Sequence, residues 1–426
     1  MLDITLIRKT PKLIEEDLKK RGDTEKLKWV SDLIKKDTVW RETKQELDKL
    51  RHKRNEISLK INGLVKQKKD TSQFIKQAKA LPNKIKQLEE KEIQLKEKID
   101  FYLMRLPNIM HPSVPVGKDA SENKQIRTFG QKSKFNFELK PHGELIEQLK
   151  IADFNKAAEV SGQGFNYIKG ELALLDQALM QFAIQFLVKR GYILIEPPLM
   201  IRKKPYTGVT DLEFFEDQLY KIEGEDLYLI ATSEHSMAAL YMNEILEEKD
   251  LPIKLCGISP CFRKEIGSHG IDTKGFFRMH QFYKIEQFIF CHPKDSWKFH
   301  EELQKNSEDM YKQLKIPFRT VNVCTGDLGS IAAKKYDLEA WFPRQNKYGE
   351  VGSNSNCTDY QARRLKIKFK DKDGEVKYLH TLNNTGIATS RALVAILENY
   401  QQKDGSIRIP TVLQKYMNNI KVIKKK

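Results

Sequence analysis

The chain of 426 residues exceeds the usual size of one domain and predicts two domains, at least one with a sizeable core. Its formal charge of +17 favours a polyanionic partner such as nucleic acid, although a generally lysine-rich composition would give the same excess. Nowhere do eighteen apolar residues run together, and the N-terminus has no long apolar core. We therefore expect neither secretion nor a membrane span, but a cytoplasmic protein whose five cysteines are reduced thiols.

Two stretches near the N-terminus carry mostly apolar residues at alternating steps of three and four, the spacing of a coiled-coil seam. The first comprises Trp40, Thr43, Leu47, Leu50, Arg54, Ile57, Ile61 and Leu64, and the second Leu81, Ile85, Leu88, Glu92, Leu95, Ile99 and Tyr102. A polar segment, QKKDTSQ, lies between them. We predict an antiparallel helical hairpin over about 38–104, an arm on the order of 45 Å long.

The arm is basic, with 17 Lys and Arg residues against 10 Asp and Glu residues between positions 41 and 100. This surplus suits contacts with phosphate groups, whereas a solvated or dimerising hairpin is the alternative. The segment 108–140 has two prolines near its start, Pro112 and Pro115, and predicts a linker that runs into a first strand. We place the domain boundary near 110, giving an N-terminal domain at 1–110 and a second domain at 111–426.

The second domain mixes strand and helix signals. Residues 191–200 predict a strand that prolines end, and residues 231–246 predict a helix that Thr and Ser open. Several alternating strands lie close together, so we predict an α+β fold, a mainly antiparallel sheet with flanking helices. The sequence has no G-x-x-x-x-G-K-[ST] phosphate loop, so any nucleotide must be held in another way.

Residues 261–290 predict two strands joined by a loop that contains Gly267, Gly270 and Gly275. Alternation in the returning strand divides its side chains between two faces. One face carries Arg278, His280, Phe282, Lys284 and Glu286, and the other carries Met279, Gln281, Tyr283 and Ile285. Cation, aromatic ring and carboxylate on one face could bind phosphate, base and ammonium groups. A surface ribbon with cross-strand ion pairs is the alternative.

The pattern R-K-E-(x)n-R-M-H-Q-F-x-K-x-E in residues 263–286 resembles motif 2 of class II aminoacyl-tRNA synthetases, in the form that seryl-tRNA synthetases use. RGYILIEPPLM resembles motif 1 (about 191–200), and motif 2 spans about 261–288. ATSEHS resembles the Thr-x-Glu of the serine pocket, DLEAWFPRQNKYGEVGSNSNCTDYQARR the ATP and metal segment, and HTLNNTGIATSRALVAILENYQ motif 3 (about 380–400). The five blocks follow the family's order, and the arm precedes them.

This resemblance implies a serine–tRNA ligase. The carboxylate of L-serine attacks the α-phosphate of ATP to give seryl-adenylate and pyrophosphate, and the seryl group then passes to the 3′ end of tRNA(Ser), and of tRNA(Sec) where that tRNA exists. The arm would bind the long variable arm of the tRNA, and the motif 1 region would pair two subunits into a homodimer.

The resemblance also implies roles for single residues. Arg263, Glu265 and Arg391 are the expected catalytic residues, with Arg263 on the α-phosphate and the serine carboxylate and Arg391 on the base and γ-phosphate. The expected ATP contacts are Arg263, Lys264, Glu265, Met279, Phe282, Glu350, Val351, Gly352, Ser353 and Arg391. Glu350 and Ser353 would hold Mg²⁺.

The expected serine pocket consists of Thr232, Ser233, Glu234, Arg263, Glu286, Asn383 and Thr385. One of Glu234 and Glu286 would accept from the ammonium and the other from the hydroxyl, and the sequence leaves the assignment open. A missing hydroxyl would leave a carboxylate unpaired, which disfavours alanine.

The sequence departs from the family at two positions. Gly352 replaces a serine beside the expected metal site, and Lys264 replaces a residue that is usually small. A rare methanogen form binds serine through zinc, but the ordinary serine-pocket motif is present here and we expect no zinc. The alternatives are a synthetase-like paralogue that loads a carrier protein, which would lack the arm, and a nucleic-acid-binding protein with an inactive synthetase domain, which would have lost Arg263, Glu286 or Arg391.

Overall fold

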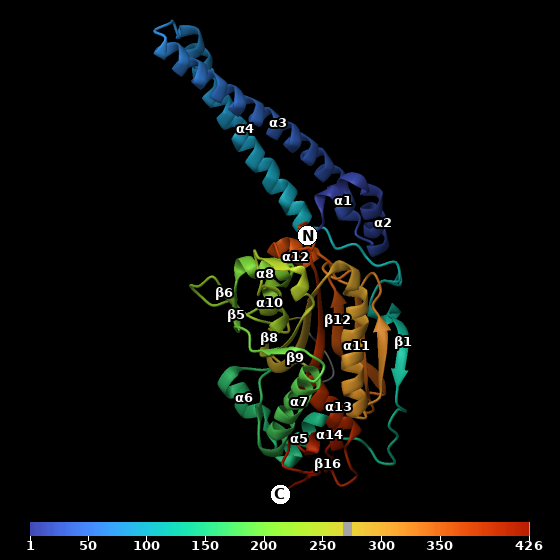
Figure 1. Ribbon diagram of the computed structural model, residues 1–426. Helices are drawn as coiled ribbons and strands as arrows, with labels where there is room; N and C mark the ends of the chain where they lie inside the picture. The colour runs from blue at the N-terminus through green and yellow to red at the C-terminus, as the bar shows by residue number, and fades with distance from the viewer. Residues whose placement is uncertain (267–274, 426) are drawn as a thin grey trace. The chain divides into compact units, whose positions relative to one another are not determined.

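The computed structural model describes residues 1–266 and 275–425, apart from the side chains of Glu213 and Phe214 (Figure 1). Gly267 and Gly270 of the expected loop therefore lie outside the described residues. The chain divides into two compact units, Met1–Pro107 and Asn108–Lys426. Each unit is described by itself below.

The first unit consists of four helices, α1 (Ile4–Lys9), α2 (Pro11–Arg21), α3 (Thr24–Lys66) and α4 (Ser72–Arg105). Gly22 ends α2 in the left-handed conformation, and the Asp23 side chain then caps α3 by accepting from the backbone N–H of Lys26. The long helices α3 and α4 pack along each other, which confirms the predicted helical hairpin. Helix α3 starts earlier than the periodic stripe, at Thr24.

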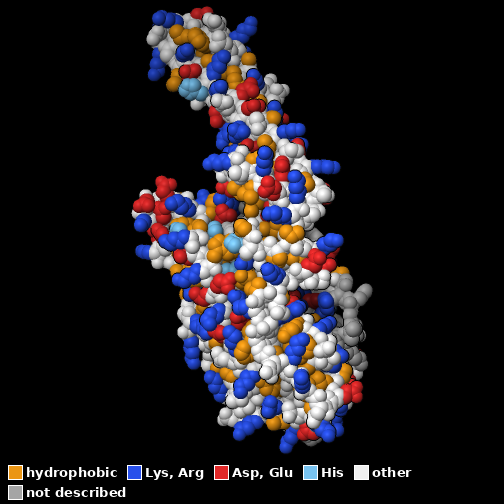
Figure 2. Space-filling model, turned by 90° about the vertical axis from the view of Figure 1, so that its right-hand side faces the viewer, with side chains coloured by type: hydrophobic (Ala, Val, Ile, Leu, Met, Phe, Trp, Pro, Cys, Tyr) orange, Lys and Arg blue, Asp and Glu red, His pale blue; other side chains and the backbone are white. Residues whose placement is uncertain are grey.

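The interior of the hairpin follows the predicted seam. Its buried members are Thr43, Leu47, Ile57, Leu81, Ile85 and Ile99, whereas Arg54 is exposed despite its seam position, because a guanidinium favours water. Two ion pairs join the helices across the seam, Glu46 with Lys84 at 2.8 Å and Arg51 with Glu89 at 2.7 Å. Lys and Arg side chains are spread over the arm surface with acidic residues among them (Figure 2).

The second unit is built on an eight-stranded sheet in the order β1-β10-β11-β12-β15-β9-β8-β4. The strands are β1 (Lys124–Phe129), β10 (Phe318–Asn322), β11 (Lys334–Phe342), β12 (Lys347–Asn356), β15 (His380–Ala388), β9 (Gln281–Cys291), β8 (Ile253–Phe262) and β4 (Ile193–Ile195). All neighbours are antiparallel except β4 and β8. The predicted fold class is confirmed.

Helices cover the sheet on both faces. Ile285, Ile289 and Cys291 of β9 join the main core with helices α7 (Gly170–Val188), α11 (Ser296–Gln313) and α13 (Thr389–Asn399). Phe288 and Phe290 point to the other face and pack in a second core beneath α10 (Ser233–Ala238). Odd and even positions of β9 thus serve different sides of the sheet, as alternation requires.

One helix of the described residues, α7, is long and apolar enough by length and composition to cross a membrane. Its inner face is part of the main core, where Leu172, Leu175, Leu179 and Leu187 are completely buried. A buried core helix can have the same length and apolar composition, so packing in the core accounts for the apolar character of α7.

Smaller elements complete the second unit. The helices are α5 (His142–Leu149), α6 (Phe154–Ser161), α8 (Lys203–Val209), α9 (Leu212–Phe215), α12 (Tyr360–Leu365) and α14 (Thr411–Gln414). Small sheets pair β2 (Ala152–Asp153) with β3 (Tyr167–Ile168), β5 (Met200–Arg202) with β6 (Leu227–Leu229), and β16 (Ile407–Arg408) with β17 (Val422–Ile423), while β13 (Lys368–Lys370) joins β7 (Ile245–Glu247) and β14 (Val376–Tyr378).

Two local predictions need correction. Residues 191–200 form only the short strand β4 before the prolines, and β5 starts at Met200 in another sheet. The helix expected at 231–246 stops at Ala238, because the chain turns and residues 245–247 pair with β13 as strand β7. The expected linker does run into a first strand, β1, and it is anchored at its start, since the amide of Asn108 donates to the carbonyl groups of Ile331 and Cys357.

The arm seam gives a stability prediction. Leu47 is 1% exposed, so Leu47→Ala should destabilise the hairpin by roughly 2–4 kcal/mol through lost burial and the cavity left behind. Hydrogen–deuterium exchange of the full chain should then speed up in α3 and α4 while the second unit keeps its protection. Leu59, which is 72% exposed on α3, is the matched control, and Leu59→Ala should change little. Equal exchange in both variants would contradict the assigned seam.

Candidate active site

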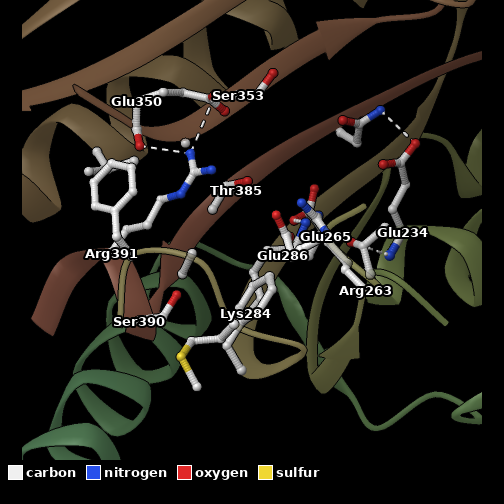
Figure 3. A pocket seen from close by; sticks show the side chains of 18 of the residues that line it. Glu234, Arg263, Glu265, Lys284, Glu286, Glu350, Ser353, Thr385, Ser390 and Arg391 are labelled. Carbon is white, nitrogen blue, oxygen red and sulfur yellow. Dashed lines mark hydrogen bonds and ion pairs between the residues drawn. The ribbon is translucent and has the colours of Figure 1, made fainter. Parts of the chain in front are cut away.

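A cavity of about 300 Å³ opens on the face of the sheet that carries α10. It is lined by every predicted site residue except Lys264 and Ser233. Figure 3 shows Arg391 and Glu350 at one end of it and Arg263 and Glu234 at the other. The lining residues come from α10, β9, β12, β15, the start of α13 and the segment after β8. Side chains far apart in sequence therefore meet in one place.

Strand β9 delivers Phe282, Lys284 and Glu286 to the cavity by alternation. The same rule predicted Met279 for the opposite face, and Met279 does belong to the main core with Ile285, but it also lines the cavity because the regular strand begins only at Gln281. Before that point the chain is held irregularly, with the backbone N–H of His280 donating to the carbonyl of Gly164 at 2.9 Å. His280 is not among the residues that line the cavity, and its ring contacts the hydroxyl of Tyr220.

Strand β15 brings Asn383 and Thr385 to the cavity through a β-bulge. Gly386 is the extra residue, and a Cβ there would lie only 3.0 Å from the carbonyl oxygen of Ile285. Glycine is therefore needed for the close approach of β15 to β9. Thr385 lies opposite Glu286 in the strand register, which places these two predicted serine contacts side by side.

Two guanidinium groups stand apart in the cavity. Arg263 follows β8, donates to the carbonyl of Ala231 at 3.3 Å, and lies over the ring of Phe282 at 5.3 Å. Arg391, at the start of α13, donates to the carbonyl of Glu350 at 2.8 Å and lies over the ring of Phe277 at 5.4 Å. Both arginines are oriented by neighbours that leave further donors for a ligand.

Glu265 and Arg278 form an ion pair at 3.7 Å beside the cavity, and Glu265 adopts a left-handed backbone conformation with φ of 49°. Lys264 points elsewhere, with its ammonium 5.9 Å from the centre of the Tyr220 ring. Ser233 is completely buried behind the lining, where it packs against Gly257. The geometry thus separates Lys264 and Ser233 from the remaining predicted site residues.

Two carboxylates share the inner end of the cavity. Glu234 accepts from the amides of Asn383 at 3.0 Å and Gln361 at 3.2 Å. Burial and the charge of Glu286 together raise the pKa of Glu234 to about 7, against the opposing charge of Lys284. Glu286 is 1% exposed, and burial raises its pKa too, although Lys284, whose ammonium lies 2.6 Å away, counteracts it.

The outer end offers oxygen ligands to a cation. Glu350, whose side chain is 47% exposed, pairs with Arg391 at 3.4 Å. Burial raises the pKa of Glu350, but the charges of Arg391 and Lys335 outweigh this and leave it lowered. An ionised carboxylate next to the hydroxyl of Ser353 fits Mg²⁺, which uses few protein ligands and keeps waters and phosphates.

Zinc is a different case, because it needs a set of nitrogen and sulfur ligands. In the part of the chain that the structure describes, no three His, Cys, Asp or Glu side chains are grouped to hold a metal ion. Cys357 lies near Asn383, which donates to its sulfur at 3.8 Å.

The sequence-based site omitted five lining residues, Phe277, Lys284, Ser355, Ala388 and Ser390. Lys284 could have been found, because alternation places it between Phe282 and Glu286. Ser355 likewise follows Ser353 by two positions on β12. Phe277 lies outside a regular strand, so no periodicity pointed to it.

Comparisons with known proteins agree with the family that the motifs predict, along the whole chain. Residues 1–110 match the seryl-tRNA synthetase N-terminal domain, and residues 216–400 match the tRNA synthetase class II core domain (G, H, P, S and T). The serine–tRNA ligase of Methanocella arvoryzae is 55% identical over 99% of this chain and 100% of that protein. The chain belongs to the seryl-tRNA synthetase family.

Solved seryl-tRNA synthetases have the same fold. The crystal structure of the Pyrococcus horikoshii enzyme complexed with ATP has a TM-score of 0.95 at 48% identity and covers 100% of both chains. The cytoplasmic serine–tRNA ligase from Naegleria fowleri, in complex with AMP, has a TM-score of 0.90 at 37% identity, covering 100% of this chain and 99% of that one. The predicted family, fold class and serine–tRNA ligase activity are confirmed.

Glu234 gives a prediction about stability and pH in this seryl-tRNA synthetase. A carboxyl group whose pKa is higher in the folded than in the unfolded chain destabilises the folded state above its unfolded pKa. Glu234→Gln keeps an oxygen for Asn383 and Gln361 and removes the charge, so the unfolding midpoint should rise by roughly 2–6 °C at pH 8. The gain should shrink as pH falls from about 7 towards 4.5.

Differential scanning calorimetry of the ligand-free protein at several pH values measures this. Glu225 is exposed and outside the cavity, so Glu225→Gln is the matched control and should leave the midpoint unchanged. A lower midpoint for Glu234→Gln at every pH would contradict the unfavourable burial of this charge.

Proposed function

We propose that this seryl-tRNA synthetase activates L-serine with ATP inside the 300 Å³ cavity and then transfers the seryl group to tRNA(Ser). The main observation in support is that Arg263 and Arg391 lie in one cavity with the carboxylates of Glu234 and Glu286. Cations suit the phosphates of ATP, and carboxylates suit the ammonium and hydroxyl of serine. The ATP and AMP complexes of the two solved relatives support nucleotide binding by this chain.

The nucleotide occupies the outer end of the cavity. Arg263 binds the α-phosphate and the serine carboxylate and so brings the two reacting groups together. Arg391 covers the adenine and reaches the γ-phosphate, with Phe282 on the opposite face of the base. Met279 and Glu265 contact the base edge. Lys264 points towards Tyr220, so its contact with ATP requires the side chain to turn.

Glu350 and Ser353 would hold Mg²⁺, which would neutralise charge on the phosphates. Charge neutralisation and positioning supply most of the catalysis in phosphoryl transfer, so no protein base is required. Val351 and Gly352 form the strand between the two ligands and contribute shape. Glu350 is already paired with Arg391, which keeps its carboxylate close to the γ-phosphate position.

The serine pocket lies at the inner end. Thr232, Glu234, Glu286, Asn383 and Thr385 surround the amino acid, while Ser233 supports the wall from behind. Both carboxylates need a partner when little water reaches them, and serine supplies an ammonium and a hydroxyl. Alanine lacks the hydroxyl, and threonine is excluded by size.

The arm binds the variable arm of the tRNA through its basic surface. The enzyme is cytoplasmic and forms a homodimer. Exposed apolar side chains around the motif 1 region support the dimer. They are Leu174, Val188, Ile193, Leu194, Leu199 and Met200. Large exposed apolar patches mark sites of association.

Pyrophosphate exchange into ATP tests the first step. Exchange should be fastest with serine and slower with threonine, alanine and glycine. Arg263→Ala and Arg391→Ala should each slow it by at least about 100-fold, because each removes a charge from the developing transition state. Arg319 pairs with Glu339 outside the cavity, so Arg319→Ala is the matched control. Exchange that is independent of serine would refute the proposed activity.

The arm should be needed for the second step alone. Glu46 and Lys84 pair across the hairpin, so residues 47–83 can be replaced by a short Gly-Ser loop without separating the remaining helices. This variant should keep wild-type exchange and lose tRNA charging by at least about 100-fold. Control chains with Leu59→Ala should charge normally. Loss of both activities would contradict the separation of arm and catalysis.

A further inference from the structure

A buried lysine shares the serine pocket, and the proposed reaction gives it no role. Lys284 is 6% exposed and lies at the centre of the sheet, opposite Ser259 on β8 and Ala388 on β15. Its side chain lines the cavity, and its ammonium lies 2.6 Å from Oε2 of Glu286 (Figure 3). Lysine is rarely buried unless it is paired, so this position has a specific reason.

The two carboxylates of the pocket have different partners. Glu234 accepts from two neutral amides, those of Asn383 and Gln361. Among the residues that the structure describes, Lys284 is the cation in ion-pair contact with Glu286. A carboxylate without a cation retains its full attraction for an ammonium, whereas one that is already neutralised suits a neutral hydroxyl donor. The charges therefore favour Glu234 for the ammonium of serine and Glu286 for its hydroxyl.

Other titratable groups around Glu286 come from three neighbouring elements. They are Glu234 and His235 on α10, Cys256 and Cys261 on β8, and Arg263 after β8. Burial lowers the pKa of His235 to about 3 and raises the pKa of Cys256 to about 12, so both remain neutral between pH 6 and 9. Burial also raises the pKa of Cys261. Of these groups Glu234, whose pKa is raised to about 7, titrates in this range.

We propose that Lys284 is a positioning residue of the serine pocket, which keeps Glu286 ionised and fixed so that it accepts from the substrate hydroxyl. This role rests on the proposed function, because it concerns the same pocket. Without Lys284, Glu286 would be an unpaired buried carboxylate and would take up a proton at higher pH. A protonated, mobile carboxyl group discriminates less between serine and alanine, since it no longer needs the hydroxyl as a partner.

The experiment compares Lys284→Met and Lys284→Arg with the wild type in serine- and alanine-dependent pyrophosphate exchange between pH 6 and 9. Lys284→Met should lower kcat/KM for serine by at least about tenfold at pH 7, and the ratio of serine to alanine should fall by a similar factor. As the pH is lowered, the fall in the serine-to-alanine ratio of kcat/KM should begin about one pH unit higher than in the wild type. Glu234 is assigned to the ammonium, which serine and alanine share, so it affects both amino acids alike. A change in the serine-to-alanine ratio therefore reports on Glu286.

Lys284→Arg keeps the charge and should recover part of the selectivity. The KM for ATP should stay within about twofold of the wild type in both variants, because Lys284 acts on the amino acid. Lys254 pairs with Glu302 at 2.8 Å outside the cavity, so Lys254→Met is the matched control for loss of a paired lysine.

Two results would overturn the role of Lys284. One is unchanged serine-to-alanine selectivity in Lys284→Met, and the other is an equal loss for ATP and serine together with a lower unfolding midpoint, as a merely structural lysine would give. Absence of serine-dependent exchange in the wild type would instead refute the proposed function itself, so the two failures are distinguishable.

Discussion

Two carboxylates, Glu234 and Glu286, are largely removed from water in one cavity, and much of the site compensates for their burial. An unpaired buried carboxylate is strongly unfavourable, and two close together repel each other. Asn383 and Gln361 donate to Glu234, and Lys284 pairs with Glu286. The pKa of Glu234 nevertheless stays raised to about 7, so these protein contacts compensate only partly for its burial. A zwitterion with an ammonium and a hydroxyl supplies what is missing.

A rigid frame is needed to hold such charges apart from water. The central strands β8, β9 and β15 provide it, because residues of β9 alternate between the cavity and the main core. Ile285 anchors the strand in the core directly between Lys284 and Glu286. A shift of one residue in register would bury both charges among α7, α11 and α13. Packing of the apolar core therefore determines which charged side chains of β9 face the cavity.

Regular elements of this protein could be predicted from sequence, and irregular ones could not. The seam of α3 and α4 repeats over many residues, so its buried members Leu47, Ile57, Leu81 and Ile85 were foreseen. Met279 was predicted to face away from the cavity and does belong to the main core, but it also lines the cavity, because regular alternation does not extend before Gln281, where β9 begins. The end of α10 at Ala238 depends on pairing between β7 and β13, which lie far apart in sequence. Local propensity contains no information about such pairing.

The roles of the site residues came mainly from resemblance, and the structure adds physical reasons for one departure from the family pattern. A Cβ at position 352 would lie 3.3 Å from the Cβ of Thr385, closer than ordinary van der Waals contact. The family's serine would therefore press on a residue of the proposed serine pocket, on a strand that a bulge already displaces. Glycine on β12 relieves this contact while Ser353 still faces the cavity. The metal strand and the amino-acid pocket are thus coupled through packing, so a change in one restricts the side chains that the other accepts.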